Sequence, residues 1–362
     1  RHTRFKCDWS SDVCSSDLYF TGFLMINHPP VENACEFGWG KAPTVTDVNL
    51  LNRLCDYYEE HKSINVTGSF EWDGIIATHA EFEELLKNRD IDKLHFYLSN
   101  MFAKPLCQGT AQGQFFYDKL VRDVDEIQKN TGFAIYDKFL CLMEANAIIP
   151  AFSPEEYQKK YDFLKFYTIE TDDYLDMLER AFDCDLKAPE FQGSHFGIQT
   201  KRHGLYSDRD IMALSIAIRI KETYWNRSDI RIADLGGGVG HLTYWLNKLG
   251  FNNVTYVDLP TVTISAMYFL ETNGITAKFI SPQEFDGDFD LVINIDGLTQ
   301  YSKEAAEGYT SKIDAKAKHF LSINREFDEF RVSDICKMRR ISRNQFWLRR
   351  GYIEEDYVPE TK

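Results

Sequence analysis

The fold of this chain is decided by the stretch Arg231-Ile-Ala-Asp-Leu-Gly-Gly-Gly-Val-Gly240. A short apolar run ends there in an acid, Asp234, and glycines follow at alternate positions, Gly236, Gly238 and Gly240. A second apolar run, Val254–Val257, ends in Asp258. Glycine permits a sharp turn and the close approach of a ligand. The pattern therefore predicts a strand, a glycine turn, a helix and a second strand, the unit that cradles a nucleoside-containing cofactor at the carboxyl edge of a parallel sheet.

The acid before the glycines distinguishes between the cofactors that such a unit can hold. A dinucleotide site would place its third glycine at position 241, which is His241 here, and Asp234 would repel a pyrophosphate at the start of the helix. The same acid suits a ligand that carries an ammonium and a sulfonium, which points to S-adenosylmethionine (SAM). A nicotinamide site and a glycine turn without any ligand are the alternatives.

Each predicted cofactor residue has a separate expected role. Asp258 follows the glycines by one helix and one strand, and its carboxylate can accept hydrogen bonds from two ribose hydroxyls. Gln283, after the third predicted strand, is the candidate contact for adenine. We therefore predict that the cofactor is bound by Asp234, Gly236, Gly238, Gly240, Asp258 and Gln283.

The residues after Asp258 continue the alternation of helices and strands. Helices are predicted at 261–273 and 301–316, and strands at 277–280, 289–295 and 319–324. The segments 345–349 and 352–358 flank Arg350-Gly351 and are predicted to form a closing antiparallel hairpin. This alternation indicates an α/β fold, a doubly wound Rossmann-like sheet with the hairpin at its edge.

With these elements in place, the sequence resembles the class I SAM-dependent methyltransferases, and more narrowly the sugar O-methyltransferase family found among polysaccharide-building enzymes. The resemblance covers about residues 190–358 and rests on Asp234-Leu-Gly-Gly-Gly-Val-Gly240, Tyr256-Val-Asp-Leu-Pro260, Asn294-Ile-Asp-Gly-Leu-Thr-Gln300 and Leu321-Ser-Ile-Asn324. The glycine loop is specific for the class I superfamily, and the Asp-Leu-Pro sequence narrows the resemblance to fewer families within it. The resemblance implies SAM as cofactor and a sugar hydroxyl, on a nucleotide-sugar or polysaccharide precursor, as the methyl acceptor.

Plant-type small-molecule O-methyltransferases share both the glycine loop and the Asp-Leu-Pro step. Those enzymes carry a His-Asp-Trp sequence after the fourth strand, and its His is the base. This chain has Ile295-Asp-Gly-Leu-Thr299 there, without a His, which argues against that family and leaves the base unassigned. A phenol-type acceptor is the first alternative, and a SAM-binding regulatory protein without turnover is the second.

Methyl transfer to a hydroxyl requires an aligned acceptor and a base that removes its proton. Asp296 follows the fourth strand and is the first candidate, with a helix cap or a contact to the SAM ammonium as alternatives. His241 begins a helix, whose N-terminus disfavours the cationic imidazole, and is the second candidate. Glu326, just after the fifth strand, is the third, with a solvated loop acid as the alternative. We predict no metal ligands, although a hard-cation site near Asp296 stays open.

The segment Ser207-Asp-Arg-Asp210 predicts a capping box at the start of a helix over 211–222. In related folds, the helix before the first strand covers the methionine end of SAM. Tyr206 and Arg209 are therefore candidates for contact with ligand or acceptor, with a purely structural role as the alternative.

The region before the glycine loop differs in character. Residues 8–18 look like an in-frame translation of a sequencing adapter, so residues 1–18 are treated as an artefact and left out of the fold prediction. Residues 19–205 are predicted to form an all-helical domain, and residues 206–362 the SAM-binding methyltransferase domain. Helices are predicted at 45–60, 81–101, 114–130, 135–147, 155–168 and 172–183. The favoured interpretation is a domain that packs its own core. Since pyranose faces stack on aromatic rings, the alternative hypothesis is that part of this aromatic-rich domain forms a lid over the cofactor edge and shapes the acceptor pocket.

Composition excludes several classes of partner. The net charge of −15 opposes binding to nucleic acid or to anionic lipid, because both require a basic surface. No apolar run approaches the ~18 residues that a membrane span needs. The six cysteines after residue 18 form no C-x-x-C pair, which predicts a reduced protein in the cytoplasm. The sequence predicts no oligomeric state.

Overall fold

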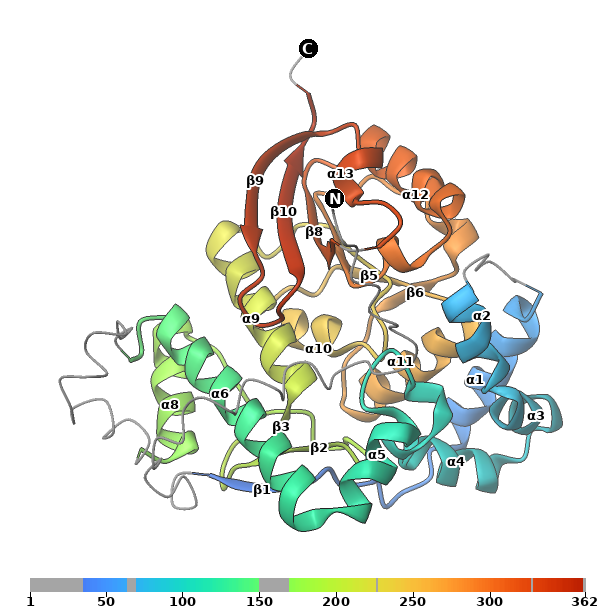
Figure 1. Ribbon diagram of the computed structural model, residues 1–362. Coiled ribbons are helices and arrows are strands. Elements are labelled where there is room, and N and C mark those ends of the chain that lie inside the picture. The colour runs from blue at the N-terminus through green and yellow to red at the C-terminus, as the bar shows by residue number, and fades with distance from the viewer. Residues whose placement is uncertain (1–34, 64–69, 150–168, 226, 327, 361–362) are drawn as a thin grey trace, which may run out of the picture.

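The larger of two sheets organises the fold. The computed structural model describes residues 35–63, 70–149, 169–225, 227–326 and 328–360 (Figure 1). Within these ranges the sheet has the strand order β6-β5-β4-β7-β8-β10-β9. The strands are β4 (Ile232–Leu235), β5 (Val254–Val257), β6 (Lys278–Ile280), β7 (Leu291–Ile295), β8 (Phe320–Arg325), β9 (Arg339–Gln345) and β10 (Tyr352–Val358). The first five pair in parallel, whereas β10 runs antiparallel to β8 and β9. Chain order reverses beside β4, which places a topological switch point between β4 and β7.

Helices cover both faces of this sheet (Figure 1). They are α9 (Asp208–Thr223), α10 (His241–Lys248) and α11 (Pro260–Thr272) on one face, and α12 (Lys303–Lys316) and α13 (Val332–Ile335) on the other. Leu291 and Ile293 of β7 belong to the apolar cluster of the first face and Val292 to that of the second, as the alternation of a strand requires. The sheet is doubly wound and ends in an antiparallel hairpin, so the predicted α/β architecture is confirmed.

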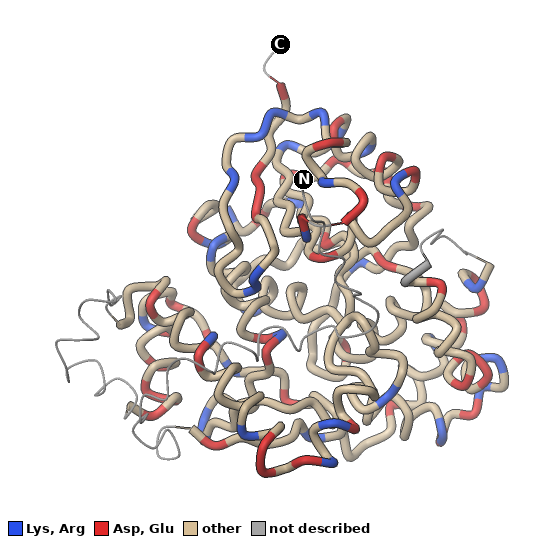
Figure 2. Tube along the Cα trace, viewed as in Figure 1, with Lys and Arg blue, Asp and Glu red and all other residues tan. Residues whose placement is uncertain are grey.

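The first strand of the hairpin begins earlier than the sequence predicts. β9 ends at Gln345, where the predicted strand 345–349 begins. β9 is the edge of the sheet, and its sequence RRISRNQ lacks an apolar pattern. Its Arg340 and Arg343 pair instead with Glu355 of β10, at 2.7 and 2.9 Å, and Figure 2 shows the basic positions of β9 beside acidic positions of β10. Of the apolar residues that suggested a strand, Phe346 and Leu348 are buried in the turn, whereas Trp347 is exposed.

The region before β4 is mainly helical, as predicted, but it also contains a small antiparallel sheet. This sheet joins β1 (Glu36–Trp39), β2 (Phe196–Gln199) and β3 (Leu205–Ser207), and it corrects the prediction of an all-helical domain. Its strands have only three or four residues, too few to show alternation in the sequence. The described helices of the region include α1 (Val48–His61), α2 (Phe70–Ala77), α3 (Ala80–Asn88), α4 (Ile91–Ser99), α5 (Gly113–Arg122), α6 (Lys129–Ala145) and α8 (Thr171–Phe182).

The predicted helix 81–101 is in fact two helices, α3 and α4. Arg89 ends α3 in a left-handed conformation, with a φ of 50°. Asp90 then begins α4 by accepting a hydrogen bond from the backbone N–H of Lys93. The predicted helix 155–168 and the adapter-like residues 1–18 lie outside the described residues. No described helix combines the length and hydropathy that crossing a bilayer requires.

One hydrophobic cluster runs through both predicted domains. It includes Leu54 of α1 and Phe139 of α6 together with Ile232 of β4 and Phe269 of α11. α1 packs on α11, and α6 packs on α9. The domain boundary at 205 and 206 stays a prediction, but the packing joins the two parts through a continuous core.

Phe102 tests this shared core. Its side chain is fully buried, and its ring stacks on His195 at 4.2 Å and meets Phe269 of α11 edge-on at 6.2 Å. We expect Phe102→Ala to lower the free energy of unfolding by about 3–5 kcal/mol, because it leaves a cavity between the two regions. Denaturant titration followed by circular dichroism measures the loss.

The matched control is Phe115→Ala, since the Phe115 side chain is 52% exposed. We expect this change to cost less than about 1 kcal/mol. Equal losses for the two variants would contradict the assignment of Phe102 to a shared core.

Candidate active site

A pocket opens at the carboxyl ends of β4, β5 and β7, beside the switch point. Its lining residues are Trp72, Gly109, Thr110, Arg209, Met212, Ala213, Asp234, Gly236, Gly237, Gly238, Val239, His241, Leu242, Asp258, Ile295, Asp296, Gly297 and Tyr301. The predicted site residues that meet here are Asp234, Gly236, Gly238, His241, Asp258 and Asp296. The sheet therefore brings together residues that lie up to 62 positions apart in this part of the chain.

Three glycines shape the loop between β4 and α10. Gly236, Gly238 and Gly240 have φ values of 70°, 59° and 96°, in the left-handed region that favours glycine. A Cβ at Gly236 would lie 2.9 Å from the Tyr301 hydroxyl, and one at Gly240 would lie 3.0 Å from Leu270. Backbone conformation therefore accounts for glycine at all three positions that the sequence singled out.

Buried asparagines tie the glycine loop to the loop after β7. Asn294, at the end of β7, donates from its side-chain amide to the carbonyl of Leu235 at 2.9 Å and accepts from the backbone N–H of Leu298 at 3.0 Å. Asn324 of β8 donates to the Asn294 side-chain oxygen at 2.9 Å and accepts from the N–H of Gly297. The network holds both walls of the pocket in one arrangement.

Two buried carboxyl groups flank the glycine loop. Asp234 accepts a hydrogen bond from the hydroxyl of Thr243 at 2.8 Å. Asp258 accepts from the backbone N–H groups of Gly238 and Leu259, at 2.9 and 2.7 Å. Burial raises the pKa of Asp234 to about 6 and that of Asp258 to about 7. Both acids are thus oriented by the fold while their charged forms are disfavoured by desolvation.

His241 lies at the start of α10 with its imidazole buried among rings. The ring of Phe269 is 4.9 Å away and that of His195 is 5.6 Å away. Burial lowers the pKa of His241 well below its usual value, and His195 and Arg209 lower it further. Among the described residues, its Nε2 atom has no hydrogen-bond partner. His241 is therefore a neutral imidazole with one unused ring nitrogen in a residue that lines the pocket.

Asp296 also lines the pocket, but its carboxylate is occupied. Its Oδ1 accepts from the amide of Gln300 and the hydroxyl of Tyr352, both at 2.7 Å. Its Oδ2 accepts from the guanidinium of Arg349 at 2.5 Å. Asp296 also has a left-handed backbone, with a φ of 52°. These partners hold the side chain at the closing hairpin.

Gly240 turns the loop without lining the pocket, and two further predicted site residues also lie outside the lining. Glu326 pairs with Arg343 of β9 at 2.5 Å. Gln283 is exposed, in the short helix that follows β6. The expected roles of these residues stay predictions without a geometric basis in this pocket.

The predicted capping box at Ser207 and Asp210 is present. The two candidate contacts beside it, Tyr206 and Arg209, have different surroundings. Arg209 lines the pocket. Tyr206 is buried and donates its hydroxyl proton to the carbonyl of Leu186, which is a structural role.

Sequence reasoning missed the residues that the N-terminal region contributes. Trp72 of α2 lines the pocket, and its indole N–H donates to Gln300 at 3.0 Å. Gly109 and Thr110 reach the glycine loop from the segment before α5. Among the other lining residues that were not predicted, Ile295 and Gly297 lie inside the Asn294–Gln300 motif and Tyr301 directly follows it.

No family model and no curated protein matches the chain. Among solved structures, it is similar to magnesium protoporphyrin IX methyltransferase from Synechocystis PCC 6803 with bound SAM, at 19% identity over 42% of this chain and 80% of that one, with a TM-score of 0.37. It is also similar to a ribosomal protein L11 methylase from Lactobacillus delbrueckii subsp. bulgaricus, at 16% identity over 41% and 80%, with a TM-score of 0.34. It is also similar to mitomycin 7-O-methyltransferase, at 15% identity over 41% of this chain and 54% of that one, with a TM-score of 0.34. Similarity at this level says nothing about the substrate of this chain.

Proposed function

We propose that this protein is a SAM-dependent O-methyltransferase that acts on a sugar hydroxyl of a nucleotide-sugar or polysaccharide precursor. The observation that carries the SAM assignment is the pair of buried acids, Asp234 and Asp258, on either side of a loop of left-handed glycines. Such a pocket favours a ligand that brings positive charge and hydroxyl donors, and it disfavours an anionic pyrophosphate.

The donor set fits SAM residue by residue. Asp258 has lone pairs left after its two backbone hydrogen bonds and can accept from both ribose hydroxyls. Asp234 supplies negative charge toward the methionine end. The glycine loop lets the Tyr301 hydroxyl and Leu270 approach positions that a Cβ would crowd. When bound, SAM supplies the electrophilic methyl group, and the remaining work of the protein is to align the acceptor and to accept its proton.

Among the three predicted bases, His241 has the chemistry that a base requires. A base needs an unprotonated atom with a free lone pair near the reacting atoms. The Nε2 atom of His241 has no hydrogen-bond partner among the described residues, and burial lowers the pKa of the imidazole, which keeps the ring neutral at neutral pH. Asp296 instead accepts from Arg349, and Glu326 pairs with Arg343 outside the pocket. We therefore assign proton removal to His241 and a positioning role to Asp296.

The sugar acceptor is supported by the resemblance of the motifs and by the aromatic residues of the pocket. Trp72 comes from the N-terminal region and Tyr301 from the loop after β7, and both line the pocket. Aromatic rings of this kind can stack on the apolar face of a pyranose. The contribution of α2 and of the segment at Thr110 to the pocket lining supports the hypothesis that part of the N-terminal region forms a lid.

Asp258 generates a prediction about pH. SAM binding through its carboxylate requires the ionised form, and burial raises the pKa of Asp258 to about 7. Below that pH the group is protonated, so the affinity for SAM falls as pH is lowered. We expect the Kd for SAM to be about tenfold higher at pH 6 than at pH 8, as calorimetry can measure.

Asp258→Asn separates this titration from others in the pocket. The amide should bind SAM on the order of 10–100-fold more weakly at pH 8 and show a flat response between pH 7 and 8, because a charge-assisted acceptor is lost. Asp286→Asn, at an exposed acid paired with Lys316, is the control and should match the parent. Equal affinity for SAM in parent and Asp258→Asn protein would refute the ribose role.

His241 generates a prediction about rate. His241→Gln should lower kcat by about 10²–10⁴-fold, because the general base is lost. The Kd for SAM should change little, since the glycine loop and both acids are retained. Glu326→Gln is the control and should keep the parental kcat. A large loss in the control together with none in His241→Gln would reverse the assignment of the base.

The acceptor is tested by incubating the protein and SAM with nucleotide-sugars, glycosides and catechols in parallel. We expect methyl transfer to a sugar hydroxyl, identified by mass spectrometry and by the chemical shift of the new methyl ether. Methylation of catechols alone would favour the phenol-type alternative. Tight SAM binding without turnover on any acceptor would favour a regulatory protein.

A further inference from the structure

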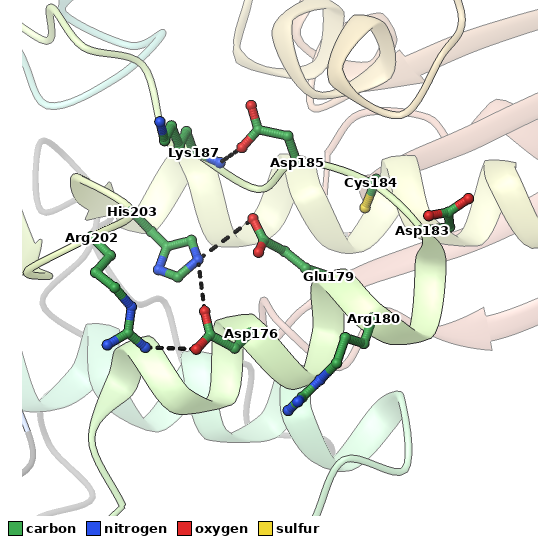
Figure 3. Close-up of a pocket in the computed structure, with 9 residues that line it drawn as sticks. All are labelled: Asp176, Glu179, Arg180, Asp183, Cys184, Asp185, Lys187, Arg202 and His203. Atoms are coloured by element: carbon green, nitrogen blue, oxygen red, sulfur yellow. Dashed lines mark hydrogen bonds and ion pairs between the residues drawn. The ribbon is translucent and has the colours of Figure 1, made fainter.

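A second pocket lies away from the glycine loop, between α8 and the loop that joins β2 to β3. Figure 3 shows Asp176 and Glu179 on α8 and His203 on that loop, all directed toward one point. Each residue offers one ligand atom, and these atoms lie within 4.8 Å of one another. No residue of this pocket lines the glycine-loop pocket.

The orientation of His203 is fixed from behind by a buried acid. Its Nδ1 lies 2.8 Å from Oδ1 of Asp172, and both side chains are almost completely buried. Asp172 also accepts from the backbone N–H groups of Lys201 and Arg202, at 2.7 and 2.9 Å, which keeps it ionised. Nδ1 is therefore the protonated nitrogen, and Nε2 directs a lone pair at the two carboxylates of α8. A carboxylate behind a histidine in this way is the usual support of a metal-binding imidazole.

The distances among the three ligand atoms leave space for a cation between them. Nε2 of His203 lies 3.4 Å from Oδ1 of Asp176 and 3.5 Å from Oε1 of Glu179. A charge-assisted N–H···O bond would be about 2.7–2.9 Å. Two ligands of one tetrahedral Zn²⁺, with bonds of about 2.1 Å, lie about 3.4 Å apart. We propose that Asp176, Glu179 and His203 bind a divalent cation, for which one imidazole and two carboxylates favour Zn²⁺.

The neighbours of the two carboxylates hold them without blocking the proposed ligand atoms. Arg202 donates to Oδ2 of Asp176 at 2.7 Å and leaves Oδ1 facing His203. The backbone N–H of Leu186 donates to Oε1 of Glu179 at 2.8 Å and leaves that oxygen a second lone pair. Water from the open side of the pocket can complete the tetrahedron. The ion would fasten α8 to the loop before β3, and it takes no part in the proposed methyl transfer.

The test uses the untagged full chain, treated with chelator and then titrated with Co²⁺ or Zn²⁺. We expect one Co²⁺ per chain, with the intense visible absorption of tetrahedral coordination, and a Tm that rises with added Zn²⁺. Glu179→Gln and Asp176→Asn should each weaken binding at least about tenfold while SAM affinity is unchanged. Asp183→Asn, at an exposed acid of the same pocket outside the ligand group, should bind as the parent does.

Two results would overturn the proposal. In the first, the parent protein binds neither Co²⁺ nor Zn²⁺ at micromolar concentration. The two carboxylates would then be held by ion pairs with a protonated His203. In the second, Co²⁺ binding persists in Glu179→Gln and shows a sulfur charge-transfer band, which would assign the ion to a cysteine site. Because SAM binding is measured on the same samples, a failure here is distinguishable from a failure of the proposed methyltransferase function.

Discussion

The structure depends on the burial of two carboxyl groups at the ends of adjacent parallel strands. Asp234 and Asp258 are removed from water on either side of the glycine loop, and their raised pKa values reflect the cost of keeping them charged there. Backbone N–H groups offset part of that cost for Asp258. The loop can supply such donors only in the conformation that its left-handed glycines allow. A bound ligand with a positive charge and hydroxyl donors would offset the rest.

The contacts of Asp296 and His241, and not their positions in the sequence, decide which of the two is proposed as the base. Asp296 and His241 both follow a strand or a loop at the same edge of the sheet, where sequence reasoning ranks the acid first. The closing hairpin brings Arg349 and Tyr352 to Asp296. The carboxylate of Asp296 therefore accepts hydrogen bonds that hold the loop after β7. The imidazole of His241 packs among the rings of Phe269 and His195, and its Nε2 has no hydrogen-bond partner among the described residues.

The sequence predicts the parts of the fold that obey short-range rules. The strands before Asp234 and Asp258 are continuous apolar runs because both faces of a parallel sheet are covered. The positions with a left-handed backbone can also be predicted from the sequence, because residue types other than glycine are disfavoured there. β9 was misplaced because an exposed edge strand is stabilised by arginines that pair across the sheet, which leaves no apolar pattern. Gln283 was chosen from its place after a strand, and that place is exposed.

The walls of the pocket that come from the N-terminal region could not be read from the sequence at all. Trp72 and Thr110 lie more than 120 residues before Asp234, and nothing in their local pattern separates them from aromatic and polar residues of the helical core. They reach the glycine loop because α1 and the segment around Phe102 pack on α11, the helix that begins directly after Asp258. The same apolar packing that stabilises the chain therefore sets the distance between the N-terminal wall of the pocket and the glycine loop. In the proposed methyltransferase, acceptor specificity would depend on this shared core as much as on the residues that line the pocket.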